Sequence, residues 1–216
     1  MYIPRQLEET SLEVMRALIR AHSLGTWVIH NGDELVANHI PFYLDATRGE
    51  FGTLVAHVAR ANPVWQSLTE STPSLVIFQG PESYITPSWY PSKHEHGRVV
   101  PTWNYAVVHA HGVAQVTNDR AWLRNHLQQL TNTHEASHSI PWQVSDAPAD
   151  FTDKLIDAIV GIEIPIQNMI GKWKMHQHRS DAEKLGVVAG LTHRGDAESI
   201  AVAKLVQQHI GIGKTP

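Results

Sequence analysis

The stretch Phe78–Val113, FQGPESYITPSWYPSKHEHGRVVPTWNYAVVHAHGV, says more about the fold than any other part of the chain. It contains two strand-like runs that are rich in aromatic and small hydroxyl residues, and a short polar link joins them. Side chains alternate between the two faces of a strand. The second run therefore places Thr102 and Asn104 on one face, and Trp103 and Tyr105 on the other.

A core strand normally carries aliphatic side chains on its buried face, and Thr102 and Asn104 depart from that pattern. Burying a hydroxyl or an amide without a hydrogen bond costs free energy, so we expect these groups to have a partner. Together with the indoles and with the nearby cations Lys93 and Arg98, they form a lining suited to a flat, anionic ligand with polar edges. A barrel with a polar outer face would explain any one of these residues but not the whole set.

Composition sets the broad class of the protein. With 216 residues, 42% hydrophobic and 18% charged, the chain reads as an ordinary globular protein with one substantial core. The net charge of -4 and the lack of a basic run argue against strong non-specific binding to nucleic acid. The absence of cysteine excludes disulfides, thiolate metal sites and thiol nucleophiles. No signal core or membrane-length apolar run is present, so we expect a cytoplasmic protein.

Short strands at close spacing, separated by Gly and Pro turns, predict a mainly β fold with α decoration. We expect strands at 26–29, 35–44, 51–58, 75–78, 83–86 and 99–116, and a strand pair within 162–177. Helices are expected within 10–24, 119–130, 151–160, 180–191 and 196–210. With no repeat or linker, the chain is interpreted as a single domain over 1–216, with a helical extension from about 178 to 216.

The sequence HEASH fits the HExxH pattern of zinc peptidases, in which His134 and His138 would share one face of a helix. Its flanks are polar, and Pro141 would cut the helix short. A short pattern in a chain with 15 histidines is a weak signal, so a zinc hydrolase is a remote alternative.

Two basic clusters are better candidates for an anion site. The sequence GKWKMHQ places Lys172, Lys174 and His176 on one face of a strand. Two lysines in register can clamp a phosphate, although lysines on an edge strand also discourage aggregation. The sequence HVARANP ends a strand and presents Arg60 and Asn62 at the following turn.

Blocks of sequence spread over nearly the whole chain match a known family. They are MYIP at 1–4, HVARANP at 57–63, FQGP at 78–81, YITPSWY at 84–90, VPTWNY at 100–105 and GKWKM at 171–175. In this order they resemble the PaiB-type FMN-binding negative transcriptional regulators, and TPSWY and VPTWNY are highly specific. One departure stands out. Where the family is expected to continue KLSQN, this chain reads KMHQH, so His176 and His178 replace a serine and an asparagine.

The resemblance implies an FMN-binding split β-barrel, shared with pyridoxamine-phosphate oxidases and flavin reductases, with the flavin at a homodimer interface. FMN requires cations for its phosphate, polar groups for its ring edge and aromatic surface for its ring faces. The resemblance thus implies three groups of cofactor-binding residues. The phosphate would be bound by Arg60, Lys172 and Lys174, with Asn62 beside Arg60. The ring edge would meet Ser88, Thr102, Asn104 and Gln177, and the ring faces would meet Trp89, Tyr90, Trp103 and Tyr105. No residue stands out as a catalytic base, so any redox chemistry would belong to the flavin.

Three functions from different classes stay open at this point. The first is an FMN-binding homodimer with a regulatory role, acting through DNA or a protein partner. The second is a flavin-dependent oxidoreductase, or a split-barrel relative that binds haem through its histidines. The third is the zinc hydrolase. Direct DNA contact is implied only by the family name, because neither the charge nor a helix-turn-helix motif supports it.

Overall fold

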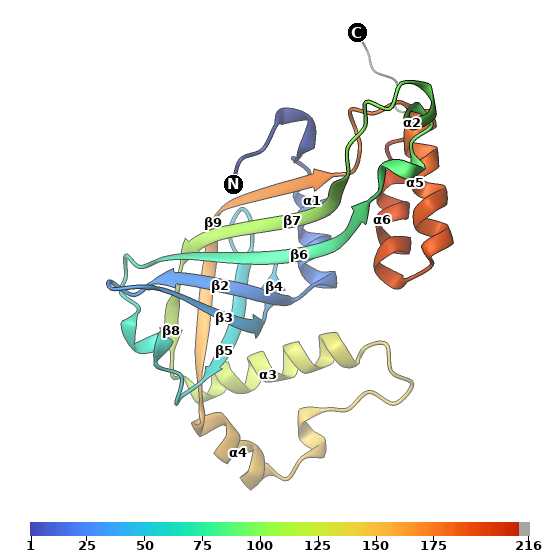
Figure 1. The fold of residues 1–216 in the computed structure, drawn as a ribbon. Helices are drawn as coiled ribbons and strands as arrows, with labels where there is room; N and C mark the ends of the chain where they lie inside the picture. Colours follow the sequence, from blue (N-terminus) through green and yellow to red (C-terminus); the bar gives the residue numbers. More distant parts are fainter. Residues whose placement is uncertain (212–216) are drawn as a thin grey trace. The chain divides into compact units, whose positions relative to one another are not determined.

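The structure is a computed structural model that describes residues 1–211 (Figure 1). Its helices and strands confirm the predicted mixture of short strands and peripheral helices. The elements in chain order are η1 (Arg5–Leu7), β1 (Glu8–Glu9), α1 (Leu12–Ala21), β2 (Leu24–His30), β3 (Leu35–Pro41), β4 (Tyr43–Asp45), β5 (Thr53–Ala59), η2 (Pro63–Ser67), β6 (Pro73–Ile85), η3 (Pro87–Trp89), α2 (Ser92–Glu95), β7 (Thr102–Val113), β8 (Gln115–Thr117), α3 (Arg120–Glu135), η4 (Val144–Asp146), α4 (Ala149–Asp157), β9 (Ile159–Lys174), α5 (Asp181–Arg194) and α6 (Ala197–Gln207).

The chain divides into two compact units. Unit 1 comprises Met1–Ser11, Gln79–Val108 and the chain from Ile170 onward, and unit 2 comprises Leu12–Phe78 and His109–Met169. Neighbouring strands are hydrogen-bonded in the order β3-β2-β6-β7-β9-β5-β4, and β6, β7 and β9 each contribute residues to both units. The single domain over 1–216 therefore stays a prediction, and residues 212–216 at its end lie outside the described part of the chain.

Unit 2 is built on antiparallel pairs. A turn at Asn31 joins β2 to β3 as a hairpin, and the Asn31 side chain accepts hydrogen bonds from the backbone of Asp33 and Glu34. Strand β2 also pairs with β6, and β5 lies between β4 and β9. Alternation along β2 buries Trp27 and Ile29 almost completely. Apolar side chains from β2 and β6 and from β4, β5 and β9 thus form the core of this unit.

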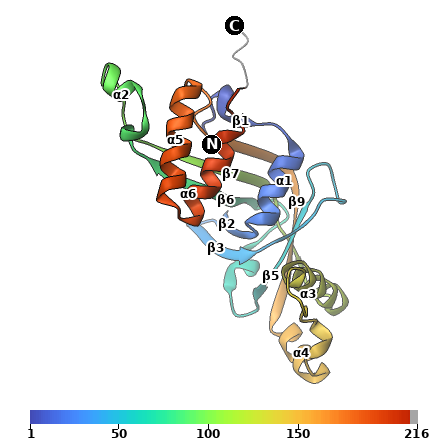
Figure 2. The ribbon, with the colours of Figure 1, turned by 90° about the vertical axis from the view of Figure 1, so that its right-hand side faces the viewer.

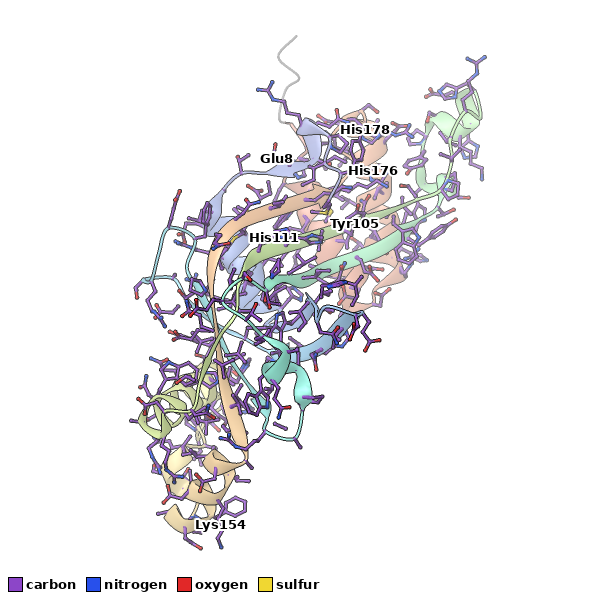
Figure 3. The ribbon with its side chains drawn as sticks, turned by 90° about the vertical axis from the view of Figure 1, so that its left-hand side faces the viewer. Glu8, Tyr105, His111, Lys154, His176 and His178 are labelled. Atoms are coloured by element: carbon purple, nitrogen blue, oxygen red, sulfur yellow. The ribbon has the colours of Figure 1, made fainter. Side chains whose placement is uncertain are left out.

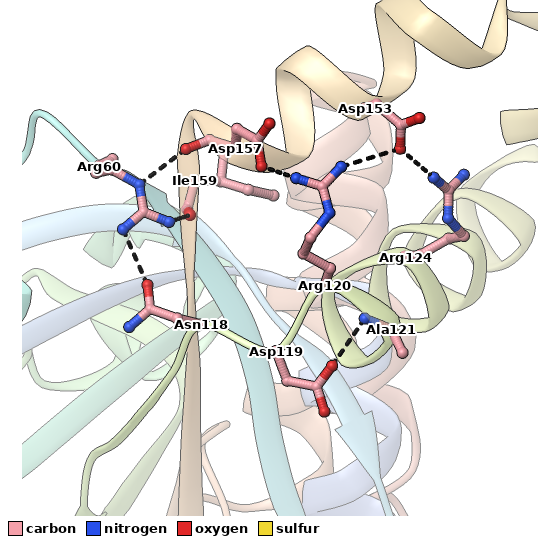
Figure 4. A network of polar contacts seen from close by, with 9 residues as sticks. All are labelled: Arg60, Asn118, Asp119, Arg120, Ala121, Arg124, Asp153, Asp157 and Ile159. Atoms are coloured by element: carbon pink, nitrogen blue, oxygen red, sulfur yellow. Dashed lines mark hydrogen bonds and ion pairs between the residues drawn. The ribbon is translucent and has the colours of Figure 1, made fainter.

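Three helices complete unit 2. Helix α1 buries Met15, Leu18 and Ile19, as the helical spacing predicts. Helix α3 begins after the cap Asp119, whose carboxylate accepts hydrogen bonds from the next turn of backbone. Helix α4 packs on α3, and Figure 4 shows that Asp153 joins them.

Unit 1 carries the helical hairpin α5–α6, whose two helices lie side by side in Figure 2. Helix α5 starts after the cap Ser180, where a helix was expected to begin, and ends before Gly195, which adopts the left-handed conformation with φ 77°. A side chain at Gly190 would place its Cβ 2.2 Å from Trp89, so glycine at this position allows α5 to dock directly on η3. Short strand β1 pairs with Gly171 and Lys172 at the end of β9.

Some expectations about the strands are wrong. The run expected at 35–44 is two strands, β3 and β4, which pair with different neighbours. The runs expected at 75–78 and 83–86 form one strand, β6, because the backbone stays extended through Gly80-Pro81. The expected strand pair within 162–177 is likewise one long strand, β9, which tolerates Pro165. No helix within residues 1–211 has both the length and the apolar character needed to cross a membrane.

The zinc alternative is not supported. Helix α3 ends at Glu135, so His138 does not share a helix face with His134. The His134 imidazole instead lies 3.5 Å from the Ser23 hydroxyl. Within residues 1–211, no group of three or more histidine, aspartate or glutamate side chains is arranged to hold a metal ion.

Candidate functional site

A pocket of about 200 Å³ lies in unit 1, where the start of β7 and the turn after β9 come together. Six of its eight lining residues are polar or charged, and two of these, Lys174 and Arg179, are strong cations. The lining residues are Val100, Pro101, Thr102, Asn104, Lys174, His176, His178 and Arg179. Three of them were predicted from the sequence as cofactor ligands: Thr102, Asn104 and Lys174. The fold therefore brings these three predicted ligands into one pocket.

Asn104 is the most informative residue of the pocket. It is 0% exposed, and both the oxygen and the nitrogen of its side-chain amide are buried without a hydrogen-bond partner. The alternation of β7 explains its burial, because Ala106 and Val108 on the same face are core residues. An unsatisfied buried polar group costs about 1–3 kcal/mol, so a partner that both donates and accepts at Asn104 would recover that cost.

Two of the predicted phosphate ligands, Lys172 and Lys174, lie on the same face of β9. The Lys174 ammonium donates to the Thr102 hydroxyl at 2.6 Å. The Lys172 ammonium donates to the backbone oxygen of Tyr2 at 3.1 Å and lies 5.4 Å from the centre of the Tyr105 ring, which Figure 3 labels. Both lysines are only partly exposed, and neither is paired with a carboxylate within the described residues. Their positive charge is therefore available to an anion.

A buried tyrosine and histidine form the back of the site. The Tyr90 hydroxyl lies 2.6 Å from Nε2 of His176, and both residues are almost fully buried. Burial, with the nearby charges of His178, Arg179 and Lys174, lowers the pKa of His176 to about 4. Burial also raises the pKa of the Tyr90 phenol. Both groups are thus neutral near pH 7.

Other predicted ligands have structural partners. The Gln177 side chain accepts from the backbone of Met175 and donates to the backbone oxygen of Trp173, which closes the turn after β9. The Ser88 hydroxyl accepts from the Lys93 ammonium. Trp89 lies under the Arg194 guanidinium, 4.8 Å from the ring centre. The structure therefore engages these three in the scaffold, and their contact with a cofactor stays a prediction.

An aromatic pair lies on the surface of unit 1. Trp103 is 51% exposed and meets Tyr84, itself 41% exposed, edge to face at 6.0 Å. Nearby in sequence, Val100 is 67% exposed. Large apolar side chains that gather on a surface are typical of an interaction site.

Arg60 and Asn62 belong to unit 2, and both are engaged there. The Arg60 guanidinium donates to the backbone oxygens of Asp157 and Ile159 at 2.8 Å each, and to the Asn118 side chain at 2.9 Å (Figure 4). Asn62 caps η2 through the Val64 backbone. These contacts hold the junction between α4 and β9, which gives Arg60 a structural role.

We therefore expect Arg60→Ala to lower the free energy of unfolding by about 1–3 kcal/mol, because it leaves the carbonyl oxygens of Asp157 and Ile159 and the Asn118 side chain without their donor. FMN affinity should change less than twofold. Arg60→Lys keeps the charge, but its single nitrogen cannot reach the three acceptors that Nε, Nη1 and Nη2 of Arg60 contact, so it should be destabilised nearly as much. Urea unfolding and flavin titration of both variants check this. A large loss of FMN affinity in Arg60→Ala that Arg60→Lys restores would instead place Arg60 on the phosphate.

Unit 2 also contains a second polar cluster, which the sequence did not reveal. His126 is 1% exposed, stacks on Trp122, and its Nε2 lies 3.0 Å from Nδ1 of His57. Trp122 donates to Glu163, which also forms a short bidentate ion pair with Arg48. Burial, followed by the nearby His57, lowers the pKa of His126 to about 4. A cavity of about 230 Å³ adjoins this cluster.

Arg179 is a pocket residue that sequence reasoning missed. Its guanidinium lies 5.2 Å from the centre of the Tyr90 ring and pairs with Glu183 at 3.3 Å. The one sequence signal for Arg179 was its position, two residues after the end of the strand pair expected within 162–177. His176, expected on the strand face of Lys172 and Lys174 but not among the predicted ligands, lines the pocket at the turn that Gln177 closes.

The sequence and the fold both match known proteins. A family model described as "Putative FMN-binding domain" matches residues 1–168. The chain belongs to this FMN-binding family. An uncharacterized protein of Emericella nidulans is 32% identical to it, over 96% of this chain and 97% of that protein. The Bacillus subtilis protease synthase and sporulation protein PAI 2, the PaiB protein, is 26% identical over 97% and 98% of the two chains.

Solved structures share the fold of this FMN-binding protein. The FAD and heme binding protein of Mycobacterium smegmatis aligns with a TM-score of 0.58, 20% identity, and coverage of 77% of this chain and 73% of that one. The flavocytochrome Anf3 of Azotobacter vinelandii aligns with a TM-score of 0.59, 14% identity, and coverage of 80% and 72%. The predictions of a split-barrel fold, of FMN as cofactor and of PaiB similarity are confirmed.

The pocket of unit 1 has the chemistry that FMN requires. The pyrimidine edge of the flavin ring presents carbonyl oxygens beside an N–H group, and the unsatisfied amide of Asn104 can both donate and accept. The phosphate requires cations: Lys174 lines the pocket, and Lys172 lies two residues before it on the same face of β9. FMN therefore fits the residues that are present.

Proposed function

We propose that this protein binds FMN in the pocket of unit 1, with Lys172 and Lys174 on the phosphate beside Thr102, and with Asn104 on the ring edge. The observation that carries the proposal is the buried Asn104 amide, whose oxygen and nitrogen both lack a hydrogen-bond partner. Asn104 lines the same pocket as the cations Lys174 and Arg179. Neighbouring side chains cover these amide atoms. Binding therefore requires a flexible side chain of the lining, such as Lys174 or Arg179, to turn aside.

We further propose that the active form is a homodimer. A cofactor site usually has a volume of at least about 300 Å³, whereas the pocket within one chain has about 200 Å³. The exposed pair Trp103 and Tyr84 would be covered by a second copy, and it offers aromatic surface next to the site. Trp103 and Tyr105, predicted for the ring faces, would then contribute at the interface.

The bound flavin would supply hydride or single-electron chemistry if the protein is an enzyme. The residues of this chain would bind and orient it and limit its contact with water. A regulatory role requires only that binding of FMN change the state of the protein, and the similarity to PaiB favours this role. A cytoplasmic location stays a prediction from the sequence.

Titration of the dialysed protein with FMN, followed by flavin fluorescence, tests the proposal together with light scattering. We expect saturable 1:1 binding per chain at micromolar or lower concentration, and the mass of a dimer. The visible spectrum of the protein as purified adds a check on the haem alternative. Flavin bands support the proposal, while a Soret band or a failure to bind FMN would refute it. A stable monomer that binds FMN would refute only the dimer.

Direct DNA binding is expected to be weak. The net charge is -4, and Lys204 is the only lysine or arginine of α6. On α5, Lys184 is buried and bonded to Asp181, and Arg194 donates to Ser83 and Tyr84. Any affinity seen at low salt should fall steeply as salt rises, because it would come from phosphate contacts.

A salt titration of promoter-derived and random duplexes checks this prediction. Equal, salt-sensitive binding to both duplexes is the expected result. Nanomolar binding that selects the promoter duplex at about 0.15 M salt, the physiological level, would overturn it.

A further inference from the structure

The Tyr90–His176 pair has a property that FMN binding alone does not require. Nε2 of His176 is occupied by the Tyr90 hydroxyl, while Nδ1 is buried and has no hydrogen-bond partner. His176 is 2% exposed and lines the same pocket as Asn104. One ring nitrogen is thus held by the protein, and the other is left for a ligand.

The hydrogen bond to Tyr90 determines which nitrogen carries the proton. A neutral imidazole has one N–H donor and one acceptor nitrogen. Within residues 1–211, His176 is the hydrogen-bond partner of the Tyr90 hydroxyl. If Nε2 donated to that hydroxyl, the phenol proton would be buried without an acceptor, at a cost of about 1–3 kcal/mol. The phenol is also the stronger acid, so the tyrosine donates to Nε2 and the imidazole proton lies on Nδ1.

The backbone holds His176 in place at a cost. Its φ is 63°, the only positive φ outside glycine within the described residues. A bulky residue in this left-handed region is strained by about 1–3 kcal/mol. Gln177 and the bond from the Arg179 backbone N–H to the His176 carbonyl oxygen fix the turn. Strain that is retained in a rigid turn is typical of a functional position.

We propose that Tyr90 fixes His176 as its Nδ1–H tautomer, so that His176 donates a hydrogen bond to an acceptor of the flavin ring and raises the reduction potential of bound FMN. The proposal rests on FMN binding in unit 1. A donor to the ring is worth more when the flavin is reduced and richer in electrons, so it holds reduced FMN more tightly than oxidised FMN. Tyr90 is then a positioning residue that acts through His176.

Charged groups around the pair do not displace this tautomer. Arg179 lies over the Tyr90 ring, His178 stacks on His176 at 6.2 Å, and Lys174 lines the same pocket. These neighbours disfavour a second proton on His176, and Glu183 opposes them only in part. The imidazole stays neutral near pH 7, with one proton to donate.

The first test needs no cofactor. In a ¹⁵N–¹H long-range correlation spectrum of the apo-protein at pH 7, His176 should show Nδ1 protonated and Nε2 bare. In Tyr90→Phe the preference should be reduced or reversed, while the matched control Tyr43→Phe in unit 2 should leave it unchanged. A wild-type His176 with its proton on Nε2 would overturn the proposal whether or not FMN binds.

The second test uses the FMN-loaded protein and its two-electron reduction potential. Tyr90→Phe and His176→Asn should each weaken binding of oxidised FMN by about three- to tenfold and binding of reduced FMN by a further tenfold. That extra tenfold corresponds to a potential lower by about 30 mV for a two-electron couple. Asparagine tolerates positive φ, so His176→Asn should fold, and thermal melting of the apo-protein verifies this for both variants.

The outcomes separate the two proposals. Wild-type protein that fails to bind FMN refutes the proposed function and leaves the tautomer to the first test. Wild-type protein that binds FMN, with potentials that are the same in both variants, refutes the role of the pair toward the flavin.

Discussion

The double variant Lys172→Ala with Lys174→Ala is expected to bind FMN at least a hundredfold more weakly than the wild type. Each lysine would make a charge-assisted contact with the phosphate worth about 1.5–3 kcal/mol, which corresponds to roughly ten- to a hundredfold in affinity. The two side chains share one face of β9 and one ligand group, so their effects need not add fully. Each single variant should lose about ten- to a hundredfold.

The stability of the apo-protein should change by less than about 1 kcal/mol in these variants, because partly exposed lysine contacts contribute little. Lys154→Ala is the matched control. It removes the same charge from α4 in unit 2, where the side chain is 80% exposed (Figure 3). Fluorescence titration of the wild type, both single variants, the double variant and the control at one salt concentration gives the comparison. If the double variant binds FMN as the control does, the lysines are a solvated strand end and the phosphate lies elsewhere.

Acid is expected to destabilise the protein strongly between about pH 6.5 and pH 4. His126 and His176 are buried in separate units, and the pKa of each is lowered to about 4. In the unfolded chain a histidine has a pKa of about 6.5. Between these values the unfolded state takes up protons that the folded state does not, so stability is lost as the pH falls through this window. The expected loss is about 2 kcal/mol per histidine by pH 5.

Urea unfolding at pH 7 and pH 5 measures the effect. His126→Asn with His176→Asn removes both titrating groups, so this variant should lose about 3–4 kcal/mol less than the wild type between the two pH values. His138→Asn, which changes an exposed histidine, should behave as the wild type does. Equal pH sensitivity in all three proteins would show that burial does not keep His126 and His176 neutral in the folded protein.

Local signals in the sequence predicted much of the fold. The helices expected to begin at 119 and 180 and the strands expected at 26–29 and 51–58 each correspond to an element of the structure. These features act over a few residues, so they can be recognised without a fold. The lengths of β6 and β9 were wrong because pairing with neighbouring strands keeps the backbone extended across Gly80-Pro81 and Pro165.

The candidate site was predicted less completely, and for a physical reason. Strand alternation correctly singled out Asn104 as a costly buried amide, and the lysines as a cationic face. Arg60 was a good candidate by charge alone, yet its donors are occupied by carbonyl groups of residues about 100 positions away in the chain. The Tyr90–His176 bond joins residues that are 86 positions apart. Contacts of this kind depend on tertiary structure, and no local pattern encodes them.

A crystal structure of the protein with FMN tests the central claim most directly. We predict that the flavin lies in the pocket of unit 1, with its phosphate within hydrogen-bonding distance of Lys172 or Lys174 and its ring edge on the Asn104 amide. Nδ1 of His176 should lie within the same range of a ring acceptor. Flavin bound in the His126 cavity of unit 2, or flavin in unit 1 that leaves Asn104 without a partner, would contradict this account.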